Sequence, residues 1–309
     1  MATNTGIAWT DSTWNPLRGC SRVSDGCRNC YAEIQAAKAN GPDQPYEGLV
    51  EMKSDGPHWT GKMMFVEKHF EDPLRWQKPR RIFVNSMSDL FHENVPDEWI
   101  DRIFAVMALS PKHTFQILTK RAERMRDYLS TPGRDAKIWW AARPLAQSRG
   151  KDIYDVLPVP GPGMGPEGIG IKAWPLPNVW LGVSAEDQAA ANIRLPFLLD
   201  TRAAVRFISA EPLLGPIDLG EAAAPDTQGR AANQDMGIRV LHWVIVGGES
   251  GENFRPMQKE WAEQLRDQCA ASTPPTSFFF KQDSDLKPGQ RSDLLGEVIQ
   301  EMPEYAGVI

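Results

Sequence analysis

Short apolar runs that end in small or polar residues recur along this chain of 309 residues, and they constrain its fold more than any other feature. Each run is rich in Val, Ile, Leu, Phe and Trp, which is typical of strands that are buried on both faces of a parallel sheet. A short run near residues 13–15 begins the series. The longer runs cover residues 81–89, 114–121, 178–187, 205–212, 242–250 and 277–282.

Helical patterns lie between several of these runs. Residues 97–107 place four apolar side chains on one helical face before Pro111 ends the pattern. Trp261, Leu265 and Cys269 share a face of another predicted helix. Strands that alternate with helices form repeated βαβ units. The sequence therefore predicts an α/β fold, an incomplete parallel (β/α) barrel of about six to seven units.

We expect one barrel domain over residues 1–309, with a short C-terminal extension from about residue 283. Chemistry in such barrels lies at the carboxyl ends of the strands, where Ser, Asp, Lys, Glu and Gly collect in this sequence. The barrel pattern is interrupted by insertions at about 42–80, 131–177 and 219–238. The second insertion is rich in Pro and Gly, and long loops of this kind are usually lids, partner surfaces or disordered segments.

Three of the four cysteines, Cys20, Cys27 and Cys30, lie within one short stretch with the spacing C-x6-C-x2-C. Soft thiolate ligands select zinc, copper(I) or an iron–sulfur cluster. A structural zinc site needs a fourth protein ligand, for which His58, His69 and His92 are the candidates. A cubane cluster can instead leave its fourth iron open to a small molecule. Cys269 lies on an apolar helical stripe, where a free cysteine packs as a small hydrophobe.

The overall charge excludes one class of function. The formal net charge is −6, which argues against a protein coated with basic surface for non-specific nucleic-acid binding.

Few, clustered cysteines do not form the pattern of a secreted disulfide scaffold, so we expect a reducing cytoplasm. The first residues lack the basic start and apolar core of a signal peptide, and no apolar run approaches the length of a membrane span.

Seven segments, taken in order, resemble a known family. They are residues 7–33, 84–92, 118–121, 180–184, 209–213, 246–251 and 279–282. Together they resemble a widespread phage-associated family of three-cysteine proteins, which are distant members of the radical S-adenosylmethionine (SAM) superfamily. Ordered matches over this much of the chain are far more specific than the cysteine spacing alone. For a phage-encoded protein the compartment would be the host cell cytoplasm.

The resemblance implies a 4Fe-4S cluster held by Cys20, Cys27 and Cys30, with SAM bound to the open iron. One electron, from a donor such as flavodoxin or ferredoxin, would cleave SAM and give a 5'-deoxyadenosyl radical that abstracts hydrogen. Two features depart from the superfamily. Its usual cysteine spacing is three residues and then two, whereas six and then two occur here. The position before the third cysteine, usually aromatic, is Asn29, and Tyr31 follows the cysteine instead.

The strand ends supply the other predicted SAM contacts. The resemblance implies that Ser86, Ser88 and Asp89 bind the amino group of SAM, while a fixed cation at Lys120 suits its carboxylate. The remaining candidates are Ser184 and Glu186 for the ribose, and Glu211, Gly247, Gly248, Glu249 and Tyr31 for other contacts. Several of these residues also have a plainer interpretation: a polar strand end with an Asx turn for Ser86, Ser88 and Asp89, the acid of a helix N-terminus for Glu186, and a tight turn for the glycines.

A nucleobase in phage DNA, modified or not, is the predicted substrate, and a protein or small-molecule substrate stays open. Basic clusters at 78–81, 120–124 and 143–151, together with Trp139, Trp140 and Trp174, would suit a single-stranded or flipped-out base. Arg121, in the second of these clusters, would equally suit the start of a helix that faces solvent. Two alternatives stay open. One is a zinc-stabilised nucleic-acid-binding or phage accessory protein without catalysis, and the other is an enzyme that uses SAM for non-radical group transfer.

Overall fold

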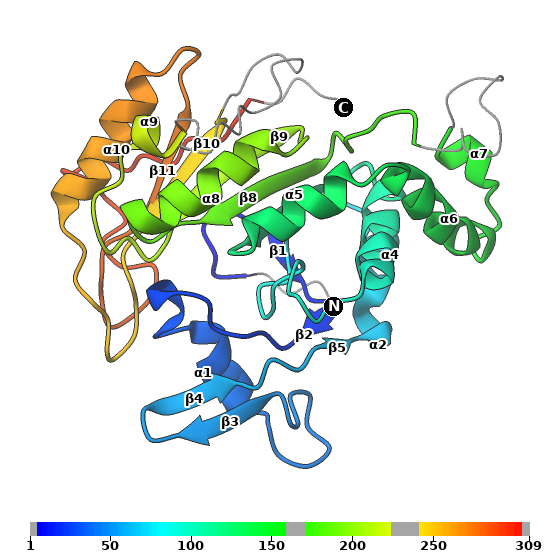
Figure 1. The fold of residues 1–309 in the computed structure, drawn as a ribbon, viewed down its shortest axis with the longest axis horizontal. Helices are drawn as coiled ribbons and strands as arrows, with labels where there is room; N and C mark the ends of the chain where they lie inside the picture. Colours follow the sequence, from blue (N-terminus) through cyan, green and yellow to red (C-terminus); the bar gives the residue numbers. More distant parts are fainter. Residues whose placement is uncertain (1–4, 159–170, 224–240, 305–309) are drawn as a thin grey trace.

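The sheet of this protein is parallel throughout, and its strands follow one another in chain order. The computed structural model describes residues 5–158, 171–223 and 241–304. Neighbouring strands pair in the order β1-β6-β7-β8-β9-β10-β11, so β1 and β11 are the two edges. The sheet curls into a half-barrel (Figure 1), which confirms the predicted incomplete (β/α) barrel. The strands are β1 (Ser12–Trp14), β6 (Arg81–Val84), β7 (Thr114–Thr119), β8 (Val179–Ser184), β9 (Val205–Ala210), β10 (Trp243–Gly247) and β11 (Ser277–Gln282).

Helices connect successive strands of the sheet. Among the described residues we find no helix whose length and apolar character would let it span a bilayer. The helices after β6 are α4 (Asp97–Ala108), α5 (Ala122–Ser130), α6 (Arg134–Gln147), α7 (Ile153–Val156), α8 (Gln188–Asp200), α9 (Leu219–Ala223) and α10 (Lys259–Ala271).

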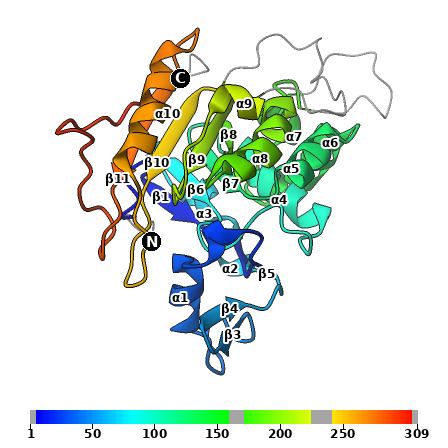
Figure 2. The same cartoon turned by 60° about the vertical axis from the view of Figure 1, so that its left-hand side comes forward.

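The chain between β1 and β6 forms a series of small elements, some of which pack into the main core through Leu17 and Phe70. In both views α1, β3 and β4 lie together, away from the helices that cover the sheet (Figures 1 and 2). Antiparallel pairing joins β2 to β5 and β3 to β4. The elements are β2 (Leu17–Arg18), the 3-10 helix η1 (Asp25–Cys27), α1 (Tyr31–Ala37), β3 (Val50–Lys53), β4 (Gly56–Trp59), β5 (Met64–Phe65), α2 (Glu67–Phe70) and α3 (Asp72–Arg75).

The predicted long loop at 131–177 contains two helices in its described part. Residues 134–147 form α6, with Pro144 inside the helix, and 153–156 form α7. Trp139 is fully buried, and its indole N–H donates to the carbonyl of Leu157 at 3.1 Å. Trp139 is therefore part of the core rather than a stacking surface. The Pro/Gly-rich residues 159–170, and residues 224–238 of the third insertion, lie outside the described residues.

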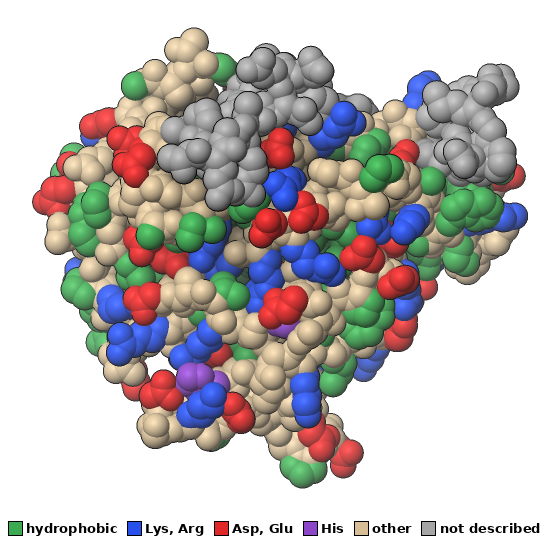
Figure 3. All heavy atoms as spheres, viewed as in Figure 1, with side chains coloured by type: hydrophobic (Ala, Val, Ile, Leu, Met, Phe, Trp, Pro, Cys, Tyr) green, Lys and Arg blue, Asp and Glu red, His purple; other side chains and the backbone are tan. Residues whose placement is uncertain are grey.

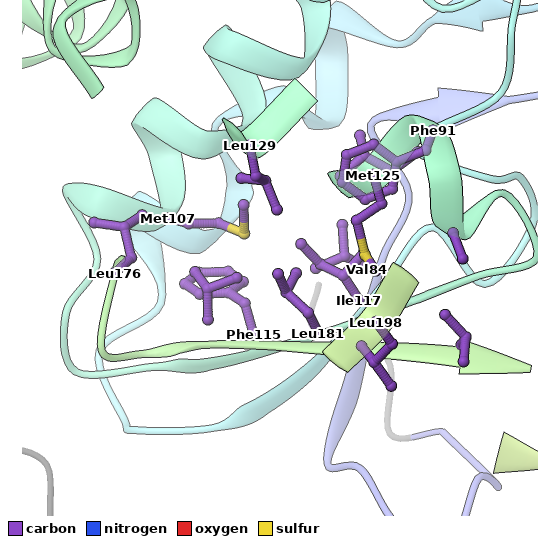
Figure 4. Packing of buried hydrophobic residues seen from close by; sticks show 14 of the residues in the cluster. Val84, Phe91, Met107, Phe115, Ile117, Met125, Leu129, Leu176, Leu181 and Leu198 are labelled. Carbon is purple, nitrogen blue, oxygen red and sulfur yellow. The ribbon is translucent and has the colours of Figure 1, made fainter. Parts of the chain in front are cut away.

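Alternate residues of each strand point to opposite sides of the sheet. The side chains that face outward pack beneath the helices in the main hydrophobic core. Figure 4 shows part of this layer, with Val84, Phe115, Ile117 and Leu181 from the strands and Phe91, Met107, Met125, Leu129, Leu176 and Leu198 from the segments that cover them.

The side chains that face inward form a second cluster, which lies toward the amino-terminal ends of the strands. Its members are largely aromatic: Trp9, Phe83, Trp180, Phe207, Trp243 and Phe279. Trp243 makes edge-to-face contacts with Trp9, Trp180 and Phe279. Farther along each strand the inward positions become small or polar, as at Asn85, Ser184 and Ser209. The aromatic layer therefore forms a floor, with polar strand ends above it.

A substitution at Gly182 tests this packing, because the missing side chain at this position leaves room for the ring of Phe207. A Cβ at Gly182 would lie 2.5 Å from that ring. Gly182→Ala should therefore lower the free energy of unfolding by about 1–3 kcal/mol through overpacking. Gly6→Ala is the control, since nothing lies within 4 Å of its Cβ position. Urea unfolding measures both variants, and equal stabilities would contradict the described inner packing.

Candidate functional site

A cavity of about 280 Å³ lies at the carboxyl ends of the strands. One side of it is formed by the cysteine segment, which we define as residues 19–30, and the other side by residues at the strand ends. The carboxyl ends of parallel strands are where barrel enzymes place their active sites. Of the predicted site residues, the lining includes Cys20, Cys27, Cys30, Tyr31, Ser86, Ser88, Asp89, Lys120, Ser184, Glu211, Gly248 and Glu249.

The three thiols of the cysteine segment are free and face the same cavity, although they come from different local structures. Cys20 follows β2, Cys27 ends η1, and Cys30 precedes the first turn of α1. Burial raises the pKa of Cys20 to about 12 and also raises that of Cys30. Ligation would therefore have to release thiol protons.

A single metal ion and a cluster demand different spacing of these thiols. Tetrahedral zinc holds its sulfur ligands within roughly 4 Å of one another. In the described part of the chain, no group of three His, Cys, Asp or Glu side chains stands in a geometry that holds one ion. A four-iron cluster is larger, and its thiolate ligands lie farther apart. Three soft donors around one cavity fit such a cluster in their chemistry.

The position of Cys20 is fixed by its neighbour. Gly19 has φ +94°, and a Cβ there would lie 2.0 Å from the carbonyl oxygen of Lys62, so only glycine fits. The next anchor is Glu33, whose side chain is almost fully buried. Its carboxylate accepts hydrogen bonds from Arg22 Nη2 at 2.7 Å and from the backbone N–H of Trp59 at 3.0 Å. Glu33 thus ties the cysteine segment to the β3–β4 hairpin.

Glu249, a predicted SAM ligand, is fully engaged by the protein. Its Oε1 accepts from Arg255 Nη2 at 2.6 Å, and its Oε2 accepts from Asn29 Nδ2 at 2.9 Å. Arg255 also reaches Asp25 through Nη1 at 2.5 Å. Burial acts to raise the pKa of Glu249, but the hydrogen bonds from Arg255 and Asn29 outweigh it and lower the pKa. Glu249 therefore joins the loop after β10 to the cysteine segment.

Asp89 lines the cavity, and the protein likewise supplies its partners. Its Oδ1 accepts from Thr119 Oγ1 at 2.7 Å and from the N–H of Phe91 at 3.0 Å. Its Oδ2 accepts from Arg121 Nη1 at 3.0 Å and from the N–H of Lys120 at 3.2 Å. The Lys120 ammonium, in contrast, makes no ion pair or hydrogen bond with any residue that the structure describes, and Lys120 is among the residues that line the cavity.

Two predicted site residues do not line the cavity. Glu186 is 2% exposed and accepts from Arg194 Nη1 at 2.8 Å. It lies beneath the cysteine segment, because a Cβ on Gly26 would come within 2.9 Å of its carboxylate. Gly247 makes room for Glu211, whose Oε1 would lie 2.6 Å from a Cβ there. Glu186 thus supports the cysteine segment, while Gly247 shapes the wall.

The other strand ends place further polar groups around the cavity. Lys281 Nζ forms an ion pair with Glu211 Oε1 at 2.8 Å, and Ser209 Oγ donates to Glu211 Oε2 at 3.0 Å. The Tyr31 hydroxyl donates to the carbonyl of Ser86 at 2.5 Å. Ser88 Oγ donates to a backbone carbonyl at 3.1 Å. Gly248 packs against the backbone of the loop after β11, which explains its lack of a side chain.

Asn85 was not predicted as a site residue from the sequence. It lines the cavity at the end of β6, is 3% exposed, and has φ +61°, which is uncommon for a residue other than glycine. Its Oδ1 accepts from the N–H of Leu17 at 3.4 Å, but its Nδ2 has no partner among the residues that the structure describes. A buried donor without a partner is costly, and such groups mark places where a ligand or water completes the site. The sequence signal that could have identified Asn85 is an Asn directly after an apolar run, at the position where a strand ends.

The three histidines proposed as zinc ligands are engaged elsewhere. His58 pairs with Asp55 at 2.9 Å and His69 with Asp72 at 3.0 Å. His92 is buried, and its Nε2 lies 2.9 Å from Ser21 Oγ. None of the three lines the cavity.

Glu249 allows a test of the anchoring role through pH. Its folded-state pKa is lowered, so its stabilisation is present above the unfolded pKa of about 4.3 and is lost as pH falls through the folded pKa. Glu249→Gln should lower the free energy of unfolding at pH 7 by about 1.5–3 kcal/mol. It should also flatten the loss of stability below about pH 4. Urea unfolding between pH 3 and 7 measures both effects, and parallel pH profiles would contradict the assignment.

The comparisons with known proteins place the chain in a family. A family model described as protein of unknown function (DUF5131) matches residues 4–302. Searches of curated proteins and of solved structures found no match. The matched range includes the cysteine segment and all the strands of the half-barrel. The chain therefore belongs to the DUF5131 family.

Proposed function

We propose that this protein is a radical SAM enzyme, in which Cys20, Cys27 and Cys30 hold a 4Fe-4S cluster beside a bound SAM molecule. The observation that carries the proposal is the shared cavity: three thiols from one short segment line the same cavity as the polar ends of the strands. Thiolate sulfur favours iron–sulfur clusters over hard cations such as magnesium. The cavity also lies at the end of the half-barrel where barrel enzymes bind substrates.

The residues with available polar groups are the best candidates to bind SAM. When bound, the cluster and SAM would supply a 5'-deoxyadenosyl radical by one-electron cleavage of the sulfonium. Lys120 offers a cation for the SAM carboxylate, and the unpartnered Nδ2 of Asn85 offers a donor. Ser184 lines the same cavity. Trp9, Phe83 and Leu118 form an apolar floor to this cavity, which suits the apolar parts of a bound ligand.

The nucleobase substrate stays a prediction. Two arginines of the basic clusters that favour it form ion pairs with acidic side chains of the protein. Arg81 pairs with Asp11 and Arg149 with Glu71. Figure 3 shows Lys and Arg side chains interspersed with Asp and Glu over the face it displays. Transfer of deuterium from a candidate substrate into 5'-deoxyadenosine is the direct test of any substrate.

The cluster ligands give the first test of the proposal. Replacing Cys20, Cys27 or Cys30 by Ala should each abolish cluster binding, because one more iron loses its protein anchor. Iron, sulfide and visible absorption after anaerobic reconstitution measure the outcome. Cys269→Ala is the matched control, since Cys269 is 1% exposed within the core and should leave the cluster intact.

Metal content and products separate the proposal from its alternatives. A colourless protein that binds zinc and no sulfide would overturn the cluster assignment. A brown protein that consumes SAM without forming 5'-deoxyadenosine would instead indicate non-radical group transfer.

Lys120 tests the SAM site. Lys120→Ala should weaken SAM binding about ten- to a hundred-fold while sparing the cluster, because one charge-assisted hydrogen bond contributes roughly 1.5–3 kcal/mol. Lys137→Ala on the exposed surface of α6 is the control. Equilibrium binding of SAM to the clustered protein gives both affinities. Equal affinities in the two variants would remove Lys120 from the site.

A further inference from the structure

We propose that Arg121 is a positioning residue that donates a hydrogen bond to the sulfur of Cys20 and thereby raises the reduction potential of the cluster. This inference rests on the proposed function, because it concerns the cluster that Cys20 would help to hold. It assigns a role to a residue whose sequence position, directly before α5, suggested a solvated helix end or a member of a basic cluster.

The guanidinium of Arg121 is buried and uses all its donors. Its side chain is 9% exposed, and Nη1 lies 3.9 Å from Cys20 Sγ and 3.0 Å from Asp89 Oδ2. Nη2 donates to the carbonyl and the hydroxyl of Ser21, at 3.2 and 2.8 Å, and Nε donates to Glu93 at 2.7 Å. An arginine presents five N–H groups in a rigid fork, and each has a partner here. One of the five partners is the thiol sulfur.

The partners of Arg121 are themselves fixed in orientation. His92 Nδ1 accepts the N–H of Asn94 at 3.0 Å, which assigns the proton to Nε2. Nε2 then donates to Ser21 Oγ, and that hydroxyl donates in turn to Glu93 Oε1 at 3.2 Å. Ser21 Oγ is therefore left to accept from Arg121. These hydrogen bonds hold the guanidinium beside Cys20, and the Glu93 side chain at the outer end of the network is 60% exposed.

The effect on the cluster follows from charge. Reduction adds one electron to an assembly whose thiolate and sulfide ligands are already negative. Hydrogen bonds to the ligand sulfurs stabilise this added charge and raise the potential. Arg121 stays protonated at any pH at which the protein is folded. Asp89 and Glu93 form ion pairs with Arg121 and neutralise much of its charge as felt at a distance. The N–H contact with Cys20 is therefore the main contribution of Arg121 to the reduction potential of the cluster.

The experiment measures the midpoint potential of the cluster without SAM. Wild type, R121K, R121Q and the control R124Q are reconstituted anaerobically, assayed for iron and sulfide, and titrated with reductant under EPR. Arg124 pairs with Asp97 and lies outside the cavity, so R124Q should match wild type. We expect R121Q to shift the potential to more negative values. R121K, which keeps the charge but loses the fork, should shift it less.

The outcomes separate this inference from the proposed function. A wild-type protein that binds no iron–sulfur cluster overturns the proposed function, and the inference with it. A fully loaded R121Q with the wild-type potential overturns the inference alone. If R121Q does not load, the loaded R121K variant decides in the same way. Failure of both variants to load beside a normal R124Q would show a purely structural role, which also overturns the inference.

Discussion

Four buried carboxylates lie around the cysteine segment, and two of them, Glu33 and Glu249, accept hydrogen bonds from it through Arg22 and Asn29. The candidate site depends on this support. The segment itself contains little regular structure beyond the short helix η1, so backbone pairing alone does not fix it. Glu33, Asp89, Glu186 and Glu249 surround it, and each is at most 6% exposed. Buried carboxylates persist only when they are paired and hydrogen-bonded. Each of the four is paired with an arginine.

This arrangement separates the acids that support the site from the groups that remain for ligands. Asp89, Glu186 and Glu249 end strands or follow them, as the sequence suggested, but their oxygens accept from protein donors. Lys120 lines the cavity with a charge that no described residue neutralises, and the Glu211–Lys281 pair lies among the other strand ends. The ligand side of the cavity is therefore richer in available cations and amides than in available carboxylates.

The parallel half-barrel could be predicted from sequence because apolar runs and polar strand ends repeat along the chain. The strand-end polar residues were placed at the cavity for the same reason: parallel strands bring their carboxyl ends to one edge. Long-range pairing could not be predicted, since nothing in the chain order shows that Arg255 reaches Asp25. The role of Arg121 was missed for this reason. The Pro/Gly run near 158–166 dominates the composition of the insertion and therefore predicts a loop. The helix α6 depends on a weaker signal, the apolar face formed by Ile138, Trp139 and Leu145.

The open edge of the half-barrel explains why the contact between Arg255 and the cysteine segment matters. The sheet ends at β1 on one side and at β11 on the other. The cysteine segment continues from the β1 side, while Arg255 belongs to the loop after β10, and its carbonyl accepts from Ser284 beyond β11. The Arg255–Asp25 and Asn29–Glu249 contacts therefore join the two sides of the half-barrel above the aromatic floor. In a closed barrel, backbone pairing joins the first strand to the last. In this half-barrel, side-chain hydrogen bonds join the two sides, and they involve the segment that carries the three thiols.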